Sequence, residues 1–239
     1  MAAEANQTHR GCRNGTATLF GEHDRVMNLV RKIVKDAAVD VGVGERPEDL
    51  GEIHSPGVAA AIWRRQLSQE FQSWIDGISP EHLPSARVML RPDAVRDTVT
   101  LLCESAGVPE DAQRELLIND VSVLAEIFSG LMGATFLRLR LDVINSDACR
   151  KFHLDSVTAR LICTYRGPGT QYGISTEGND PARVFSVATG APIVLRGTLW
   201  PDPQCSGLMH RSPPVEGSGT TRLVLVLDPV DGPTEEIRF

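Results

Sequence analysis

Aromatic residues are scarce in this 239-residue sequence, at 5%, and it contains no run of like charges. With a net charge of −7, the chain lacks the basic surface that is typical of nucleic-acid-binding proteins. No apolar run approaches the roughly 18 residues that suggest a membrane-spanning helix. The start of the sequence also lacks the basic stretch and following apolar stretch of a secretory signal. We therefore expect a cytoplasmic protein with neither a nucleic-acid nor a membrane partner.

Cysteines are few, with five in the chain, odd in number and scattered. This usage predicts free thiols in a reducing compartment rather than a disulfide framework. The spacings Cys149-x₃-His153 and Cys205-x₄-His210, together with Cys163, offer ligands for a closed tetrahedral Zn²⁺ site. They match no standard zinc finger or ribbon, and a free cysteine more often serves as a small buried apolar residue. A zinc site is therefore an alternative to the site described next.

The first half of the sequence has apolar residues at helical spacing. Residues 1–16 are polar and contain Asn-Gly, so we expect them to be disordered. Residues 17–132 are expected to be mainly helical, with helices predicted over residues 22–39, 58–78, 92–105 and 109–131.

The hydrophobic period changes after Gly133, where short alternating segments are separated by Gly, Pro, Asn and Asp. Strands are predicted over residues 136–144, 157–165, 184–188, 192–200, 207–210 and 222–228. Strands without an intervening helix favour an antiparallel sandwich or barrel. We therefore predict an α+β fold, in which a helical N-terminal half packs on a double-stranded β-helix, jelly-roll or cupin-like, over residues 133–239.

His153, Asp155 and His210 are the candidate metal ligands. His153 and Asp155 lie between two predicted strands, and His210 ends a later one. In an extended segment a spacing of two places both side chains on the same side, so one metal ion can contact both. Two histidines and one carboxylate form the face that binds Fe(II) and leaves positions open for a cosubstrate and O₂. The alternative is a surface His–Asp pair and an unrelated histidine, because a His-x-Asp pair also arises by chance.

Arg222 is the candidate for binding the distal carboxylate of 2-oxoglutarate. It begins a predicted strand shortly after His210, and an arginine pairs with a carboxylate through a bidentate fork. Thr164 and Tyr165 are expected to assist it with their hydroxyl groups. Arg211 and Arg160 are rivals for the same role, the common Arg-x-Ser pattern is absent, and the alternative is a solvent-exposed arginine at a strand end.

Several longer strings carry a family resemblance. They are residues 149–170, 210–214, 222–228, 196–200 and 62–65. From about residue 50 to the C-terminus, the chain resembles the bacterial family catalogued as domain of unknown function 1826. It departs from the family pattern at Gln171 and Tyr172, where an acidic residue and a tryptophan are expected. The resemblance implies an association with zinc-limitation genes and metallochaperone-type GTPases, and so a metal-linked role.

These observations together favour one function over two others. We expect a metal-dependent oxygenase or hydroxylase of the Fe(II)/2-oxoglutarate kind, acting on an unknown small-molecule or protein substrate. The first alternative is a zinc-binding or zinc-homeostasis protein without oxygenase activity. The second is a non-catalytic interaction module that acts through its helical half.

Overall fold

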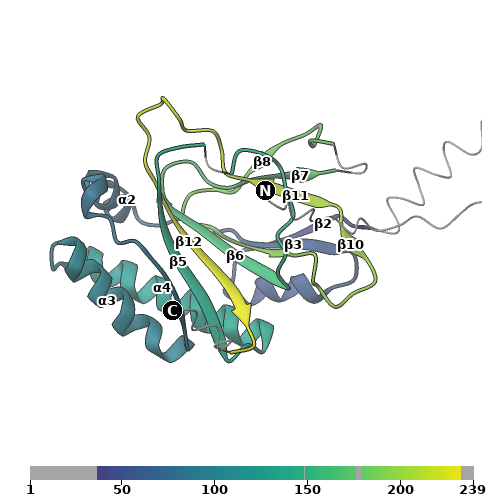
Figure 1. Ribbon diagram of the computed structural model, residues 1–239, viewed down its shortest axis with the longest axis horizontal. Helices are drawn as coiled ribbons and strands as arrows, with labels where there is room; N and C mark the ends of the chain where they lie inside the picture. The colour runs from purple at the N-terminus through teal and green to yellow at the C-terminus, as the bar shows by residue number, and fades with distance from the viewer. Residues whose placement is uncertain (1–36, 148, 176–178, 233–239) are drawn as a thin grey trace, which may run out of the picture.

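The computed structural model describes residues 37–147, 149–175 and 179–232 (Figure 1). The predicted disorder of residues 1–16 and most of the helix predicted over residues 22–39 lie outside these ranges. In the described part, no helix is both long enough and apolar enough to cross a membrane.

A seven-stranded sheet forms the centre of the fold (Figure 1). Its neighbouring strands pair antiparallel, except for one parallel pair at the β2 edge. In spatial order the strands are β2 (Asp40–Gly44), β3 (Val58–Trp63), β9 (Pro192–Arg196), β6 (Ala159–Arg166), β12 (Arg222–Val230), β5 (Phe136–Ile144) and β4 (Ala86–Leu90).

Two smaller sheets accompany the main sheet. An antiparallel three-stranded sheet has the order β11 (Leu208–Arg211), β7 (Gln171–Ile174) and β8 (Phe185–Ser186). Strands β1 (Ala37–Ala38) and β10 (Cys205–Ser206) form a short parallel pair. Leu208 and Tyr172 of the three-stranded sheet pack with residues of the main sheet, so the two sheets share an inter-sheet core.

The helices cover the other face of the main sheet (Figure 1). They are α2 (Gln69–Gly77), α3 (Val95–Ala106) and α4 (Ala112–Met132), with short 3-10 segments η1 (Pro47–His54), η2 (Pro80–His82) and η3 (Pro92–Ala94). Asp111 caps α4 by accepting hydrogen bonds from two backbone amides, and Gly133 ends the helix at a φ of 61°. The helix predicted over residues 109–131 is confirmed, and these two end signals fix where it begins and ends.

Strand alternation decides which residues face which layer. Along β12, Leu223, Leu225 and Leu227 enter the core beneath the helices, whereas Val224 and Val226 enter the inter-sheet core. A residue's place in this alternation therefore determines whether it can reach the inter-sheet side, where the candidate site lies.

The prediction of a helical N-terminal half is wrong. Strands β1 to β4 all lie before residue 91, and β2, β3 and β4 belong to the main sheet. The segment predicted as one helix over residues 58–78 divides into β3 and α2, with Ser68 capping the helix start. Ala59, Ala60 and Ala61 favour a helix by propensity, but pairing with β9 and complete burial make this stretch an interior strand.

The strand predictions after Gly133 are largely confirmed. Strands β5, β6, β9, β11 and β12 lie within or overlap the predicted ranges, and β8 is shorter than predicted. Strand β7 was not predicted, because its four residues contain a glycine and show no clear apolar alternation. The result is a sheet-rich mixed fold of helices and strands, with helices concentrated on one face of the main sheet.

Candidate metal centre

The backbone brings His153 and His210 together as a bridge between two chain segments. His153 donates its amide to the His210 carbonyl at 3.0 Å, and His210 donates its amide to the His153 carbonyl at 3.1 Å. The centroids of the two imidazole rings lie 4.6 Å apart. Two reciprocal backbone hydrogen bonds thus hold histidines that are distant in the sequence side by side.

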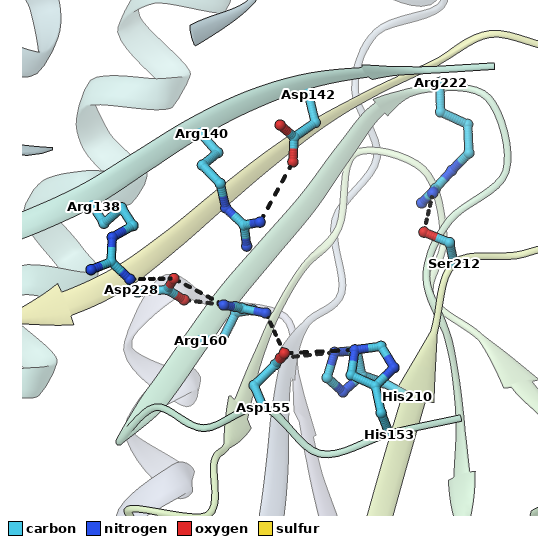
Figure 2. Close-up of polar contacts among 10 residues, drawn as sticks. All are labelled: Arg138, Arg140, Asp142, His153, Asp155, Arg160, His210, Ser212, Arg222 and Asp228. Carbon is cyan, nitrogen blue, oxygen red and sulfur yellow. Dashed lines mark hydrogen bonds and ion pairs between the residues drawn. The ribbon is translucent and has the colours of Figure 1, made fainter. Parts of the chain in front are cut away.

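Asp155 completes the group predicted from the sequence. Its Oδ2 lies 3.0 Å from His210 Nε2, and its Oδ1 lies 3.6 Å from His153 Nε2. One potential ligand atom from each residue lies within 4.8 Å of the other two (Figure 2). Hence the three side chains converge on one point, as the spacing and strand placement predict.

The donor chemistry of these residues fits a bound cation. His153 Nδ1 lies 2.9 Å from the Lys151 carbonyl oxygen, which can only accept, so Nδ1 carries the proton and the lone pair is on Nε2. Asp155 Oδ2 is buried and makes no hydrogen bond, despite its short distance to His210 Nε2. A divalent metal ion requires carboxylate oxygens and imidazole nitrogens whose lone pairs are not already used by hydrogen bonds, and this group offers them.

Arg160 orients the carboxylate of this group. Its Nη1 forms an ion pair with Asp155 Oδ1, which leaves Oδ2 toward His210 (Figure 2). On its other side, Arg160 donates from Nε and Nη2 to the two oxygens of buried Asp228, at 2.6 and 2.9 Å. Such a bidentate pair fixes the guanidinium plane. Arg160 is therefore a positioning residue beside the metal face rather than a free cation for a cosubstrate.

The protonation states follow from burial and from these contacts. Burial alone would raise the pKa of Asp155, but contacts with His153, His210 and Arg160 lower it well below its usual range. Burial lowers the pKa of His210 and so favours its neutral form, whereas the contact with Asp155 raises the pKa of His153. An ionised aspartate and a neutral histidine are the forms that bind metal.

A cavity of about 100 Å³ adjoins the two histidines. Its walls are apolar side chains from β5, β6 and β12 and polar side chains that include four arginines. The cationic lining residues are Arg140, Arg160, Arg211 and Arg222. The cavity thus joins the candidate metal face to Arg222, as the sequence predicts.

Arg222 is a buried cation without an anionic partner among the described residues. Its side chain donates to the Pro168 carbonyl at 2.7 Å, to Ser212 Oγ at 3.0 Å and to Thr164 Oγ1 at 3.3 Å. Burial lowers its pKa to about 10. Because burying an unpaired charge is costly, such a group indicates a place for an anion.

The Gly167-Pro168-Gly169 turn gives Arg222 its position. Gly167 has a φ of 76°, and a Cβ there would lie 2.9 Å from Arg222 Cγ. A Cβ on Gly169 would lie 1.9 Å from the Val187 carbonyl oxygen. The turn therefore packs closely against the arginine and supplies its carbonyl partner.

Thr164 and Tyr165 lie on opposite faces of β6. Thr164 accepts a hydrogen bond from Arg222, on the side of the cavity, but the Tyr165 hydroxyl donates to Asp120 at 2.7 Å in the core beneath the helices. The predicted contact of Tyr165 with a cosubstrate is therefore wrong, because neighbouring residues of a strand point in opposite directions. Arg211, a rival of Arg222, lines the cavity, donates to Gln171 Oε1 at 2.8 Å and lies over the Phe152 ring.

The cysteines do not form the closed site considered as an alternative. Cys163 is buried on the helix side of β6, where its Sγ donates to the Gly190 carbonyl. Cys149 lines the cavity but is outside the group formed by His153 and its partners. Among the described cysteines, Cys103, Cys149 and Cys163 are free thiols, as the cysteine usage predicts, whereas Cys205 is disulfide-bonded. Sequence reasoning missed two polar residues near the candidate site. Asp228 on β12 pairs with Arg160, and Ser212, directly after β11, accepts a hydrogen bond from Arg222.

Comparison with solved structures finds several that align with this chain in part. A rice dioxygenase for auxin oxidation aligns at a TM-score of 0.46 with 15% identity, covering 81% of this chain and 83% of that one. The Arabidopsis thaliana dioxygenase for auxin oxidation 1, as a 2-oxoglutarate complex, aligns at 0.41 with 13% identity, covering 89% and 82%. A Burkholderia pseudomallei oxidoreductase of the 2OG-Fe(II) oxygenase family aligns at 0.41 with 14% identity, covering 82% and 96%.

Sequence comparison identifies the family. No curated protein matches the chain. Residues 44–228 match the family described as "Protein of unknown function (DUF1826)". The chain belongs to this family, as its sequence resemblance implied.

Proposed function

We propose that this chain is a non-haem Fe(II) oxygenase or hydroxylase that uses 2-oxoglutarate as its cosubstrate. One observation carries the proposal: a single cavity joins an open face of two histidines and one carboxylate to a buried arginine that has no anionic partner within the described ranges. The three donors are of the kind that leaves metal positions free for small ligands. The arginine is of the kind that binds a carboxylate through a planar fork.

His153, Asp155 and His210 would hold the iron. When bound, iron supplies the redox chemistry that couples decarboxylation of 2-oxoglutarate to oxidation of the substrate by O₂. The protein side chains prepare this site in advance. Arg160 holds Asp155 ionised and oriented, and the Lys151 carbonyl fixes the tautomer of His153.

Arg222 would receive the distal carboxylate of 2-oxoglutarate. Its guanidinium is already oriented by the Pro168 carbonyl and by the hydroxyls of Ser212 and Thr164, so binding requires little rearrangement. The two hydroxyl groups can turn to donate to the incoming carboxylate. A carboxylate at this point would also offset the cost of the buried positive charge.

A zinc-handling role is the competing function. The same three side chains can bind Zn²⁺ with one position left for water. A zinc site, however, gives no reason to bury an unpaired arginine in the same cavity. The Arg222 environment therefore favours the oxygenase over zinc binding alone.

The test is an anaerobic titration of the metal-free chain with Fe(II) and then 2-oxoglutarate. We expect a visible charge-transfer band that appears only when both are present, because 2-oxoglutarate must contact the iron. His153→Ala should abolish the band, whereas His82→Ala, at a histidine in the η2 segment away from the cavity, should retain it. Zinc uptake with no band at any Fe(II) concentration would contradict the proposal and support the zinc-handling role.

A further inference from the structure

Arg140 is a second cation of the cavity whose hydrogen-bonding capacity is not satisfied. It lies on β5, and its guanidinium extends toward Arg160 and Asp155 (Figure 2). Its Nε is buried and has no hydrogen-bond partner. Its nearest carboxylate contact is a long one, 3.9 Å from Nη1 to Asp142 Oδ2. Arg140 therefore has donors directed into the cavity that no described side chain uses.

The neighbouring carboxylates are already engaged elsewhere. Asp228 and Asp155 both pair with Arg160, and Asp228 lies 4.0 Å from Arg138 as well. Burial, followed by repulsion from Arg160, lowers the pKa of Arg140, and attraction to Asp228 and Asp142 only partly opposes this shift. The surrounding carboxylates thus do not fully balance the positive charge of Arg140.

Besides the two carboxylates of 2-oxoglutarate, the arginines of the cavity could pair with a third carboxylate group. With the proposed metal and 2-oxoglutarate in place, one cosubstrate carboxylate would be at the metal and the other at Arg222. Neither would satisfy Arg140, because Arg140 lies opposite Val226 in the pairing of β5 with β12, whereas Arg222 lies opposite Ile144, farther along the same pair of strands. The adjoining walls are apolar, and the side chains that form them are Ile144, Ile162, Val224 and Val226.

We infer that the substrate is an organic carboxylate with an apolar body, and that Arg140 receives its carboxylate group. Arginine provides two parallel donors for a carboxylate, and the isoleucine and valine side chains provide contact for hydrocarbon. This inference rests on the proposed function for the identity of the bound molecule as substrate. It makes Arg140 a specificity-determining residue, distinct from Arg222.

The experiment uses the full chain loaded with Mn(II), a redox-inactive substitute for Fe(II), and saturated with 2-oxoglutarate. Saturation blocks the Arg222 position, so a further carboxylate cannot bind there. Straight-chain carboxylates from butanoate to octanoate are titrated by calorimetry, each beside its primary amide as a neutral control. We expect at least one carboxylate to bind about tenfold or more tightly than its amide, since a charge-assisted pair with arginine is lost in the amide.

Three variants identify the residue responsible. Arg140→Gln should remove the preference for carboxylate over amide, and Arg140→Lys should keep part of it because the charge remains without the fork. Arg87→Gln is the matched control, because Arg87 lies opposite Arg140 in the strand pairing of β4 with β5 but does not line the cavity. It should retain the full preference.

The outcomes separate this inference from the proposed function. Mn(II) and 2-oxoglutarate loading is measured first, and failure to load would contradict the proposed function itself. A loaded chain that binds no carboxylate of the series, or binds carboxylates and amides equally, would overturn the inference alone. So would an Arg140→Gln variant that folds, loads and keeps the wild-type preference.

Discussion

Buried polar groups on the two sides of the main sheet differ in whether other side chains satisfy them. On the helix side, Asp120 accepts two hydrogen bonds from Arg65, both at 2.6 Å, and one from Tyr165 at 2.7 Å. We refer to these three residues as the Asp120 cluster. On the other side, Arg222 is buried with no anion, and Asp155 Oδ2 with no hydrogen bond, from any residue that the structure describes.

This difference distinguishes structural polar groups from groups prepared for a ligand. Within the Asp120 cluster the charges and hydroxyl satisfy one another, so the cluster needs nothing from outside the chain. In the cavity, the arginine and the carboxylate remain available to separate external partners. A lack of internal partners alone is insufficient, because Arg114 Nε in the helical layer is also buried and unbonded. The cavity groups differ from Arg114 because they converge on one shared space.

The largest effect is expected from breaking the Asp120 cluster. Asp120→Ala would leave the Arg65 charge and the Tyr165 hydroxyl without their partner. Removing one member of a buried ion pair typically costs about 3–5 kcal/mol, so we expect a loss of this order in the free energy of unfolding. Chemical denaturation of the metal-free chain measures it. A loss near zero would show that the cluster is not the structural unit described here.

Arg222→Met should have the opposite signature. Removing an unpaired buried cation should leave the free energy of unfolding of the metal-free chain within about 1 kcal/mol of wild type, because no internal ion pair is lost. Binding of 2-oxoglutarate to the Mn(II)-loaded chain should weaken by roughly 30- to 100-fold, since the charged partner of the distal carboxylate is gone. Calorimetry measures the affinity. A strongly destabilised variant with normal 2-oxoglutarate affinity would make Arg222 structural instead.

Gly167→Ala should produce a smaller effect on the same position. The added methyl group meets Arg222 Cγ and the backbone also resists the positive φ, so we expect a loss of about 1–2 kcal/mol in unfolding free energy together with weaker 2-oxoglutarate binding. The matched control is Gly217→Ala, where φ is 75° but no atom lies within 4 Å of the added Cβ. The control should lose stability and keep its 2-oxoglutarate affinity. Equal 2-oxoglutarate affinity in both variants would show that the Gly167 turn does not position Arg222.

Asp147→Asn tests the loop that precedes Arg222 and should have the smallest effect. Asp147 Oδ1 accepts hydrogen bonds from the amides of Val215 and Glu216, which lower the pKa of Asp147. A lowered folded-state pKa means that the carboxylate contributes stability at neutral pH, which is lost as the pH falls through about 4 and below. Melting temperatures of wild type and Asp147→Asn should therefore differ slightly at pH 7 and converge on acidification. A difference that grows toward low pH would contradict this assignment.

The sequence was sufficient to predict that His153, Asp155 and His210 converge and that Arg222 lies near them, because both depend on strand placement that period-two alternation reveals. His153 and Asp155 precede β6, and His210 pairs with His153 through the backbone. Alternation also forbids Thr164 and Tyr165 from reaching the same cavity, which is why one of the two predicted contacts is wrong.

Other features depend on tertiary pairing that no local pattern contains. Arg160 and Asp228 are 68 residues apart and meet through the pairing of β6 with β12. The alanine-rich β3 reads as helix by propensity, and only its neighbours in the sheet make it a strand. The predicted fold class was therefore partly wrong in the first half of the chain, whereas the second half brings His153, Asp155 and His210 together as predicted.

The central claim is that the metal face and Arg222 form one site, and their coupling tests it most directly. Calorimetric titration of the chain with 2-oxoglutarate, with and without Mn(II), measures that coupling. We predict that the metal increases 2-oxoglutarate affinity by about tenfold or more, since one ligand would contact both ends of the cavity and binding linkage is reciprocal. Equal affinity with and without metal, or no binding in either state, would contradict the account.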